Sequence, residues 1–432
     1  MILKKKLEEK SATICVIGLG YVGLPLTCSF AKAGFEVIGL DIDDTKISKL
    51  LNKKSYISYI DDSIIKDLSN AKFTASSDYG LVSDSDVIVF CVPTPLSKNR
   101  EPDLSFVYET MKSIKPFLRE NQLISIESTT YPGMTDEIIA KEINSLGYEI
   151  GKDYSLIYSP EREDPGNKDF TTSNIPKIVG GYTDNCLNLG RCLYESIINE
   201  VVGVSSTKAA EMTKLLENIQ RSVNIGLMNE MKIICTAMDL DIHEIIKAAE
   251  TKPFGFVSYY PGPGIGGHCI PIDPFYLTWK AKEYGLNTRF VELAGEINHS
   301  MPEWVVSILT DELNRHSLPL MNSRILILGI AYKKNVDDMR ESPASLIMKK
   351  LKEKGAHFDY SDPFIPFFPK IRNFEFDLKS IEISPEIISS YDAVILVTDH
   401  DLFDYEMIIQ NAKLLIDTRG VYSIDKPNLI KA

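Results

Sequence analysis

The segment that constrains the fold most is a strand, a glycine-rich turn and a helix near the start of the chain. Residues 13–17 (TICVI) form a short apolar run typical of a strand, and the turn 18–23 (GLGYVG) follows directly, opening a helix-like stretch. Such glycines allow a tight turn and let a pyrophosphate approach the helix N-terminus. The next strand, 36–40, ends at Asp41, whose carboxylate can accept hydrogen bonds from ribose hydroxyls but would repel a 2′-phosphate. The segment therefore predicts a dinucleotide site that favours NAD over NADP.

Further apolar runs alternate with helix-like segments through the first part of the chain. These strand candidates are 86–91 (DVIVFC), 122–126 (QLISI) and 155–159 (SLIYS). Strands that alternate with helices in this way are typical of βαβ units and a parallel sheet. We therefore expect a doubly wound α/β domain, the NAD-binding domain, over residues 1–204.

A long helical pattern without proline follows, from Ser205 to about Asp239. Its apolar residues recur at helix-like spacing, which is typical of a spine or a subunit interface. A loop rich in Gly and Pro (259–274) comes next and precedes more helix. These features predict a central helical domain over residues 205–315 and favour a homodimer or a higher homo-oligomer.

The alternation of strand and helix resumes near Arg324 with 324–332 (RILILGIAY), and later strand candidates are HFDYSDP, which ends at Asp362, DAVILVTD and KLLIDTRG. No dinucleotide fingerprint is present here, since Gly329 is followed by Ile330 and Ala331. We expect a second α/β domain over residues 316–432 with a different ligand. The predicted fold is thus α/β, with two Rossmann-like doubly wound domains joined by a helical domain with a long central helix.

Composition excludes several classes of function. The 432 residues carry a formal net charge of −13, which argues against binding to nucleic acid or to an anionic membrane surface. Seven scattered cysteines without a CxxC pair argue against a disulfide framework and a zinc site, and favour a reducing compartment. The six histidines do not cluster, and His243 lacks the second histidine of a zincin helix, so no metal is expected. The N-terminus lacks the apolar run of a signal peptide and no apolar stretch is long enough to span a membrane, so we predict a cytoplasmic protein.

Three residues outside the glycine turn suggest chemistry. Lys214 and Asn218 are four residues apart on the long helix and share one face, where an ammonium and an amide can stabilise an oxyanion. The alternative is that both side chains face solvent on the helix surface and have no catalytic role. Cys269 lies among glycines just before a helix N-terminus, which lowers a thiol pKa, whereas the other six cysteines have contexts typical of structural residues. His268 is next to Cys269 in the sequence, but adjacent residues of an extended chain seldom point the same way, which argues against His268 as the base of a Cys/His pair.

A set of motifs in order along the chain resembles the UDP-glucose/GDP-mannose dehydrogenase family over essentially its whole length. They are GLGYVGLP, VPTP (92–95), EST (127–129), SPER (159–162), KLLEN (214–218), GGHCIPIDP (266–274) and YKKNVDDMRESPA (332–344). Within the family, PEREDPGN and the stretch that begins TKPFGFVSYYPGPG look most like UDP-N-acetylglucosamine 6-dehydrogenases. UDP-N-acetylmannosamine dehydrogenases are the close alternative, ahead of UDP-glucose and GDP-mannose dehydrogenases.

The resemblance implies a four-electron oxidation of the C6 hydroxyl of a UDP-sugar to a carboxylate, with two NAD molecules used in sequence. Cys269 would attack the aldehyde to form a thiohemiacetal, whose oxidation gives a thioester that water hydrolyses. Lys214 would stabilise the oxyanion of these intermediates, and Asn218 would position the C6 oxygen. Such uronic acids usually feed capsule, lipopolysaccharide or glycan assembly.

Other positions match family residues with roles in hydrolysis and binding. Asp273 would act on the water or the alcohol, while Thr129 and Glu161 match positions associated with an ordered water and with hydrolysis; the group that removes the first proton stays open. The expected cofactor contacts are Gly18, Gly20, Tyr21, Val22, Gly23, Asp41, Lys46, Thr94 and Thr129. The expected substrate contacts are Glu161, Arg162, Lys214, Asn218, Tyr259, Gly266, Lys334, Arg340 and Arg419, and Lys252 lies where relatives may reach into a neighbouring subunit's site.

Two departures bear on the substrate. UDP-glucose dehydrogenases commonly have a Lys before the aspartate and a second Glu four residues after the first, where this chain has Ile272 and Pro165. Both favour a 2-acetamido sugar. Two other classes of protein fit the sequence less well. A single-step hydroxyacid-type dehydrogenase lacks the cysteine and a second α/β domain. A non-catalytic nucleotide-sugar-binding protein would have lost catalytic residues that are present here.

Overall fold

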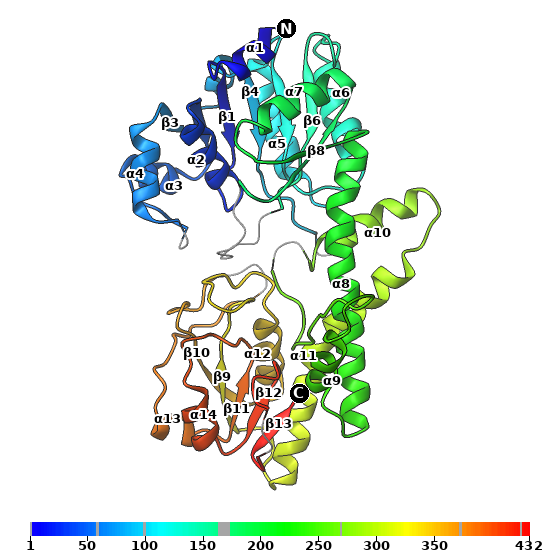
Figure 1. Ribbon diagram of the computed structural model, residues 1–432. Helices are drawn as coiled ribbons and strands as arrows, with labels where there is room; N and C mark the ends of the chain where they lie inside the picture. The colour runs from blue at the N-terminus through cyan, green and yellow to red at the C-terminus, as the bar shows by residue number, and fades with distance from the viewer. Residues whose placement is uncertain are drawn as a thin grey trace. The chain divides into compact units, whose positions relative to one another are not determined.

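The structure, a computed structural model, describes residues 2–57, 60–97, 101–162, 173–267, 270–370, 374–423 and 426–432. The chain separates into two compact units. The first comprises residues 1–217 and 275–286, and the second comprises residues 218–274 and 287–432. Each unit contains one β-sheet with helices packed on it (Figure 1).

The sheet of the first unit has eight strands in the order β3-β2-β1-β4-β5-β6-β7-β8. All neighbouring pairs are parallel except β6 and β7, which are antiparallel. The order reverses on either side of β1, which is the switch point where a doubly wound sheet binds its ligand. The strands are β1 Thr13–Ile17, β2 Glu36–Leu40, β3 Phe73–Ser76, β4 Val87–Phe90, β5 Leu123–Ile126, β6 Ser155–Tyr158, β7 Lys177–Gly181 and β8 Val201–Val204.

Helices cover this sheet because βαβ crossovers place them on its faces, which is why the central strands are apolar throughout. Aspartate side chains begin several of these helices: Asp43 and Asp61 accept hydrogen bonds from the first-turn N–H groups of α3 and α4. The helices are α1 Ile2–Glu8, α2 Gly23–Ala33, α3 Asp44–Leu51, α4 Asp62–Asn70, α5 Ser105–Ile114, α6 Ala140–Asn144, α7 Asp184–Tyr194 and α10 Asp273–Glu283, with short turns η1 Tyr79–Asp84, η2 Lys115–Phe117 and η3 Thr135–Ile139.

One helix of 31 residues, α8 (Thr207–Ala237), supplies residues to both units. It confirms the long helical pattern read between Ser205 and Asp239. α9 (Ile242–Glu250) follows it, and α11 (Arg289–Arg315) is a second long helix that contains Pro302.

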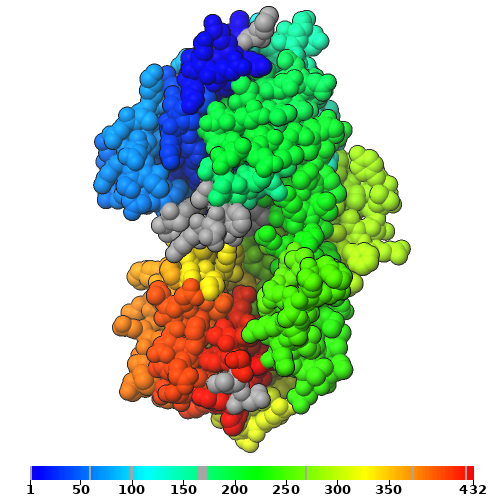
Figure 2. Space-filling model, in the orientation of Figure 1, coloured from blue at the N-terminus to red at the C-terminus, as the bar shows by residue number. Residues whose placement is uncertain are grey.

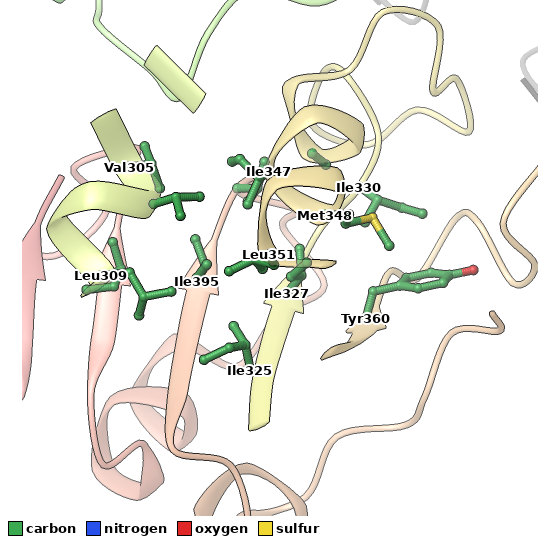
Figure 3. Packing of buried hydrophobic residues seen from close by; sticks show 14 of the residues in the cluster. Val305, Leu309, Ile325, Ile327, Ile330, Ile347, Met348, Leu351, Tyr360 and Ile395 are labelled. Atoms are coloured by element: carbon green, nitrogen blue, oxygen red, sulfur yellow. The ribbon is translucent and has the colours of Figure 1, made fainter. Parts of the chain in front are cut away.

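The sheet of the second unit has five parallel strands in the order β10-β9-β11-β12-β13. Side chains from α11 and α12 pack against β9 and β11 to form one buried core, including Val305, Leu309, Ile327, Leu351 and Ile395 (Figure 3). The elements are β9 Arg324–Leu328, α12 Pro343–Glu353, β10 His357–Ser361, α13 Pro385–Ser389, β11 Ala393–Leu396, α14 Tyr405–Asn411, β12 Leu415–Asp417 and β13 Leu429–Lys431.

The architecture confirms the predicted α/β fold with two Rossmann-like sheets and a long central helix. The predicted strands are all present, but the sequence pattern missed β3, β7, β8 and β13. These four strands are short, three to five residues each, and lie toward the outer parts of their sheets, where pairing with a neighbour defines a strand more than its own apolar pattern does. Among the described helices, none combines the length and the apolar character needed to cross a membrane. The division into domains at 204 and 315 stays a prediction.

Candidate functional site

The three glycines of the turn between β1 and α2 have separate structural roles. Gly18 has a φ of +93°, and a Cβ placed on it would lie 2.5 Å from the Cys91 carbonyl oxygen. A Cβ on Gly23 would collide with the carbonyl of Gly18, so this glycine permits the close packing of α2 on the turn. A Cβ on Gly20 would meet no atom of the described residues within 4 Å. The middle glycine therefore borders open space that a ligand can enter.

The rest of this turn fits a dinucleotide. Val22 precedes α2 and provides no side-chain cap among the described contacts, so the first N–H groups of the helix suit a pyrophosphate. Asp41 is buried at the end of β2 and accepts hydrogen bonds from the Leu19 and Asp43 amides, each at 2.9 Å. It also forms an ion pair with Lys46 Nζ at 2.9 Å. Asp41 thus braces the glycine turn as well as occupying the position expected to contact a ribose.

Other expected cofactor residues lie in the same unit. Tyr21 and Val22 are both partly exposed on the glycine turn. Thr94, after β4, is buried, and its carbonyl accepts a hydrogen bond from Tyr276 at 3.0 Å. Thr129 lies just beyond the end of β5 and is partly exposed.

An open pocket in the first unit brings several expected site residues together. Its lining includes Val22 and Leu26 from the start of α2, and Glu161 and Arg162, which follow β6. Lys214 Nζ donates a hydrogen bond to the Glu161 carbonyl at 2.5 Å, so the structure brings these two candidates together. The pocket lining also includes Glu127, Ile175, Pro176, Lys177 and Ile198.

Arg162 already has protein partners. Its guanidinium pairs with Glu217 at 2.7 Å and donates to the Pro176 carbonyl at 2.6 Å. These contacts fix the exit from the Pro160–Glu161 turn, so contact with a substrate phosphate would have to compete with them. The expectation that Arg162 binds substrate therefore stays a prediction.

In the second unit, Asn218 and Asp273 are in contact. Asn218 Nδ2 donates to Asp273 Oδ2 at 2.5 Å, and both side chains are buried. Asp273 is the first residue of α10, 55 positions along the chain from its partner on α8. Cys269 and His268, which precede Asp273 by a few residues, lie outside the described residues, as does Pro165.

The glycines before Cys269 pack against the segment that carries the expected nucleotide contacts. The Gly267 amide donates to the Arg340 carbonyl at 3.0 Å, and a Cβ on Gly266 would lie 2.7 Å from Tyr332 Cβ. Gly266 is therefore required by packing, which accounts for it without a ligand. Tyr259 donates to Gln220 Oε1 at 2.7 Å.

The cationic substrate candidates of the second unit each have a described protein partner. Lys334 forms an ion pair with Asp401 at 2.8 Å, whose hydrogen bond raises the pKa of the lysine. Arg340 binds the Asp338 carboxylate, with its shortest contact at 2.6 Å. Arg419 Nε donates to the Val397 carbonyl at 2.7 Å. Lys252 is exposed and lies over the Phe254 ring, 5.1 Å from its centroid.

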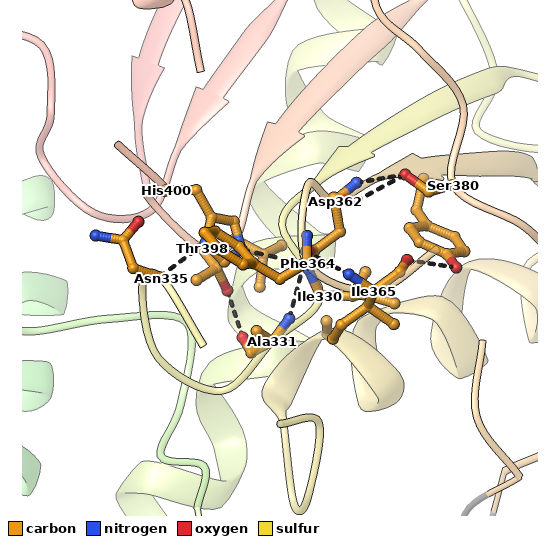
Figure 4. Close-up of polar contacts among 12 residues, drawn as sticks. Ile330, Ala331, Asn335, Asp362, Phe364, Ile365, Ser380, Thr398 and His400 are labelled. Atoms are coloured by element: carbon orange, nitrogen blue, oxygen red, sulfur yellow. Dashed lines mark hydrogen bonds and ion pairs between the residues drawn. The ribbon is translucent and has the colours of Figure 1, made fainter. Parts of the chain in front are cut away.

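A buried aspartate to which the sequence analysis assigned no role, Asp362, anchors the chain just after β9, before Lys334 and Arg340. Asp362 follows β10 and accepts hydrogen bonds from the Ile330 and Ala331 amides at 2.7 and 3.1 Å, from Phe364 and Ile365, and from His400 Nε2 at 3.1 Å (Figure 4). Burial alone would raise the pKa of this carboxyl, but these donors, His400 first, hold it below its ordinary range.

The second unit repeats the geometry of the cofactor turn without its fingerprint. Gly329 after β9 has a φ of +75°, as Gly18 has after β1, and Asp362 binds the following amides as Asp41 binds the amide of Leu19. The signal was an aspartate at the end of the second strand of each βαβ unit. His400 Nδ1 also accepts the Asn335 amide at 2.9 Å, which ties the Lys334 segment to this network.

Burial separates several other cysteines from any nucleophilic role. Burial raises the pKa of both Cys15 and Cys28 to about 12, so their thiols stay protonated near neutral pH. The six cysteines of the described residues are not in disulfide bonds, and no group of three or more His, Cys, Asp and Glu side chains there is arranged to hold a metal ion.

Comparison with known proteins identifies the family to which both units belong. Residues 12–198 match the NAD binding domain of the UDP-glucose/GDP-mannose dehydrogenase family, 208–300 its central domain and 326–424 its UDP binding domain. The chain is 33% identical over 396 residues to UDP-N-acetyl-D-glucosamine 6-dehydrogenase of Pseudomonas aeruginosa, covering 91% of this chain and 92% of that protein. It is 33% identical over 427 residues to UDP-N-acetyl-D-mannosamine dehydrogenase of Methanococcus maripaludis, covering 94% and 92%.

A solved structure shows the same arrangement of elements. The UDP-D-ManNAc dehydrogenase of Pyrococcus horikoshii superposes with a TM-score of 0.87 at 30% identity, covering 97% of this chain and 98% of that one. The glycine turn with Asp41 and the matched UDP binding domain agree with that assignment. The chain therefore belongs to the UDP-glucose/GDP-mannose dehydrogenase family, and is an NAD-dependent UDP-sugar dehydrogenase.

Proposed function

We propose that this enzyme oxidises the C6 hydroxyl of UDP-N-acetyl-D-glucosamine to a carboxylate, giving UDP-N-acetyl-D-glucosaminuronate. The contact between Asn218 and Asp273 carries this proposal. The two residues come from different helices, and a buried hydrogen bond of 2.5 Å orients the carboxylate of Asp273, four positions after Cys269 in the sequence. An oriented carboxylate and a thiol are the groups that oxidation beyond an aldehyde requires.

The proposed chemistry removes two hydrides from one carbon. NAD, which the glycine turn and Asp41 would hold, would supply the hydride acceptor for each oxidation. The alcohol loses a proton and a hydride to become an aldehyde, and the Cys269 thiolate adds to the aldehyde carbon to form a thiohemiacetal. Loss of the second hydride gives a thioester, and water displaces the thiol to release the carboxylate. Lys214 stabilises the oxyanion of the adducts, and Asn218 and Asp273 hold the C6 oxygen or the attacking water.

Glu161 and Thr129 are the remaining residues of the proposed catalytic set, and both belong to the first unit. Glu161 lines the pocket that also contains Val22 of that turn, which supports a role near the reacting carbon. Its carbonyl holds the Lys214 ammonium at 2.5 Å, so the position of one group depends on the other. Thr129 follows β5 and is partly exposed, as an ordered-water position requires.

The nucleotide half of the substrate is assigned to the second unit. Lys334, Arg340 and Arg419 belong to the matched UDP binding domain, and the first two are on the segment held by His400 and Asp362. Their carboxylate and carbonyl partners pre-position these cations, and a diphosphate would exchange those contacts for stronger charge-assisted ones.

Two observations support a 2-acetamido sugar. The relatives that match across the chain include enzymes named for N-acetylglucosamine and for N-acetylmannosamine. Ile272, which takes the place of a lysine common in UDP-glucose dehydrogenases, is buried, so this position adds no charge beside Asp273. The alternative substrate is UDP-N-acetyl-D-mannosamine, the sugar named for the similar archaeal proteins.

A substrate panel tests the proposal directly. NADH formation is followed with UDP-GlcNAc, UDP-ManNAc, UDP-GalNAc, UDP-glucose and GDP-mannose, and the NADH produced per sugar consumed is counted. We expect two NADH per sugar and the highest kcat/KM with UDP-GlcNAc. Cys269→Ser should still bind both ligands but release no uronic acid, and full steady-state turnover by this variant would refute the thioester route.

We also propose that the enzyme is a cytoplasmic homodimer or a higher homo-oligomer. The second half of α8, α9 and the turn between them present exposed apolar side chains, and this segment lies at the surface of the drawn face (Figure 2). These residues are 40–63% exposed: Leu227, Ile234, Met238, Leu240 and Ile245. Such a patch on two neighbouring helices is typical of an interface between identical chains.

A further inference from the structure

A buried ion pair forms part of the lining of the pocket in the first unit. Glu127 comes directly after β5, and Lys177 is the first residue of β7. Lys177 Nζ is 2.5 Å from Glu127 Oε2, and the two side chains are 9% and 0% exposed. Tyr194, the last residue of α7, donates a hydrogen bond to the same carboxylate, and its hydroxyl is also hydrogen-bonded to the Ser125 hydroxyl at 2.7 Å.

Stability alone does not account for this pair. Removing two charges from water costs about as much as their attraction returns, and well-packed apolar residues of the same volume usually serve a core as well or better. Pairs of this kind are most informative where one partner makes a further contact that an apolar residue could not make. Lys177 makes such a contact.

The ammonium of Lys177 also donates to the Pro160 carbonyl, at 3.3 Å. The next carbonyl along the chain, that of Glu161, accepts from Lys214 at 2.5 Å. Two lysines from different elements therefore hold consecutive carbonyl groups, just where the chain leaves β6. Pro160 has no N–H to donate, so its carbonyl is the backbone group through which hydrogen bonds can hold this residue.

The turn held in this way carries a wall of the pocket. Glu161 and Arg162 line it together with Glu127 and Lys177 themselves and with Val22 of the cofactor turn. A shift of the Pro160 carbonyl would move the Glu161 side chain and also the carbonyl that locates the Lys214 ammonium.

We infer that Lys177, with its charge balanced by Glu127, is a positioning residue that holds the Pro160–Glu161 turn and thereby places Glu161 and the Lys214 ammonium for the oxidation. It acts through these groups and does not itself contact the substrate. The inference rests on the proposed roles of Glu161 and Lys214. A displacement of about 1 Å at such groups can lower turnover by about 100-fold.

The double variant Glu127→Gln/Lys177→Met separates this role from a structural one. It removes both charges, so no unpaired buried ion remains, but it also removes the donor to the Pro160 carbonyl. We expect kcat to fall by about 10- to 100-fold, while KM for NAD changes by less than about threefold because the glycine turn is untouched. Lys177→Arg keeps the charge and the hydrogen-bond donors, so its kcat should be much closer to that of the wild type than the kcat of the double variant is. It provides a second variant if the double variant does not fold.

Tyr194→Phe is the matched control. It removes a hydrogen bond to the same Glu127 carboxylate but leaves the Lys177 contact with Pro160 in place. We expect a lower Tm with kcat within about twofold of the wild type. A merely structural role predicts instead that kcat follows Tm in the same way in both variants.

Two further variants distinguish failure of the inference from failure of the proposed function. Glu161→Gln and Lys214→Ala are measured in the same assay, NADH formation at saturating NAD and UDP-sugar. Wild-type turnover by both would refute the roles on which the inference rests. If these two lose turnover while a folded double variant, or in its absence Lys177→Met, keeps kcat within twofold of the wild type, the inference alone is overturned.

Discussion

The contact between Asn218 and Asp273 allows a quantitative prediction. Asn218 Nδ2 lies 2.5 Å from Asp273 Oδ2, and the two residues are 7% and 3% exposed. A hydrogen bond to a charged group is worth about 1.5–3 kcal/mol when its partner is removed. Since about 1.4 kcal/mol corresponds to a factor of ten, the contact should couple the two residues by about 10- to 100-fold in kcat.

A double-mutant cycle measures this coupling. We expect Asp273→Asn to lower kcat by about 100- to 10,000-fold if the carboxylate handles a proton, and Asn218→Ala to lower it as well. The double variant should then be less impaired than the product of the two single effects by the coupling factor, because Asn218 has little left to orient once the carboxylate is gone.

The assay is NADH formation at saturating NAD and UDP-sugar, with unfolding by urea to show that each variant is folded. Asn224→Ala provides the control, since Asn224 is on the same helix but donates to the Gln220 carbonyl at 2.6 Å, in an exposed contact. Its effect should simply multiply with that of Asp273→Asn. A coupling below about twofold between Asn218 and Asp273 would refute the view that they act as one unit.

Three further predictions test other parts of the structure. Asp41→Ala should narrow the preference for NAD over NADP in kcat/KM by about 10-fold, through the loss of a charged hydrogen bond, and an unchanged ratio would remove Asp41 from the cofactor site. Asp86→Asn should lower the free energy of unfolding by about 1–3 kcal/mol at pH 7. The Asp86 carboxylate pairs with Lys6 and Arg119, at 2.8 and 3.1 Å, and accepts a hydrogen bond from the Thr13 amide at 3.1 Å. Burial would raise the pKa of Asp86, but these partners hold it below its ordinary value, so this stabilisation is present above about pH 4 and should vanish as the pH falls further; urea unfolding at pH 7 and pH 3 checks the sign. Ile234→Glu should reduce the mass measured by light scattering to that of a monomer, whereas Leu402→Glu, also at an exposed site, should not; an unchanged mass for Ile234→Glu would place the interface elsewhere.

The cofactor half of the site was readable from the sequence because its residues are close together along the chain. The turn 18–23 and Asp41 belong to one βαβ unit, so the spacing of strand, turn and helix already places them at the same sheet edge. The same reasoning applies to Asp362, which follows the equivalent strand in the second unit. Without a glycine fingerprint there, the sequence pattern gave no sign that this aspartate binds backbone amides.

Contacts between distant residues were not readable in this way. Glu127 and Lys177 are 50 positions apart, and Asp362 and His400 are 38 apart. Each of these residues looks like an ordinary polar residue at the end of a strand, and only strand pairing brings the partners together. The same applies to Arg162, whose carboxylate partner Glu217 lies on α8.

The sequence by itself determined the two α/β sheets, the long helix between them and the dinucleotide turn. Each of these follows from local spacing: apolar runs of strand length, a helical period without proline, and glycines where no Cβ fits. Only the tertiary structure decided which polar groups meet. It placed Lys214 on a backbone carbonyl, joined Asn218 to Asp273 and buried Lys177 against Glu127. The reason is physical, because a buried charge or amide must find a partner, and the fold as a whole determines which partner is within reach.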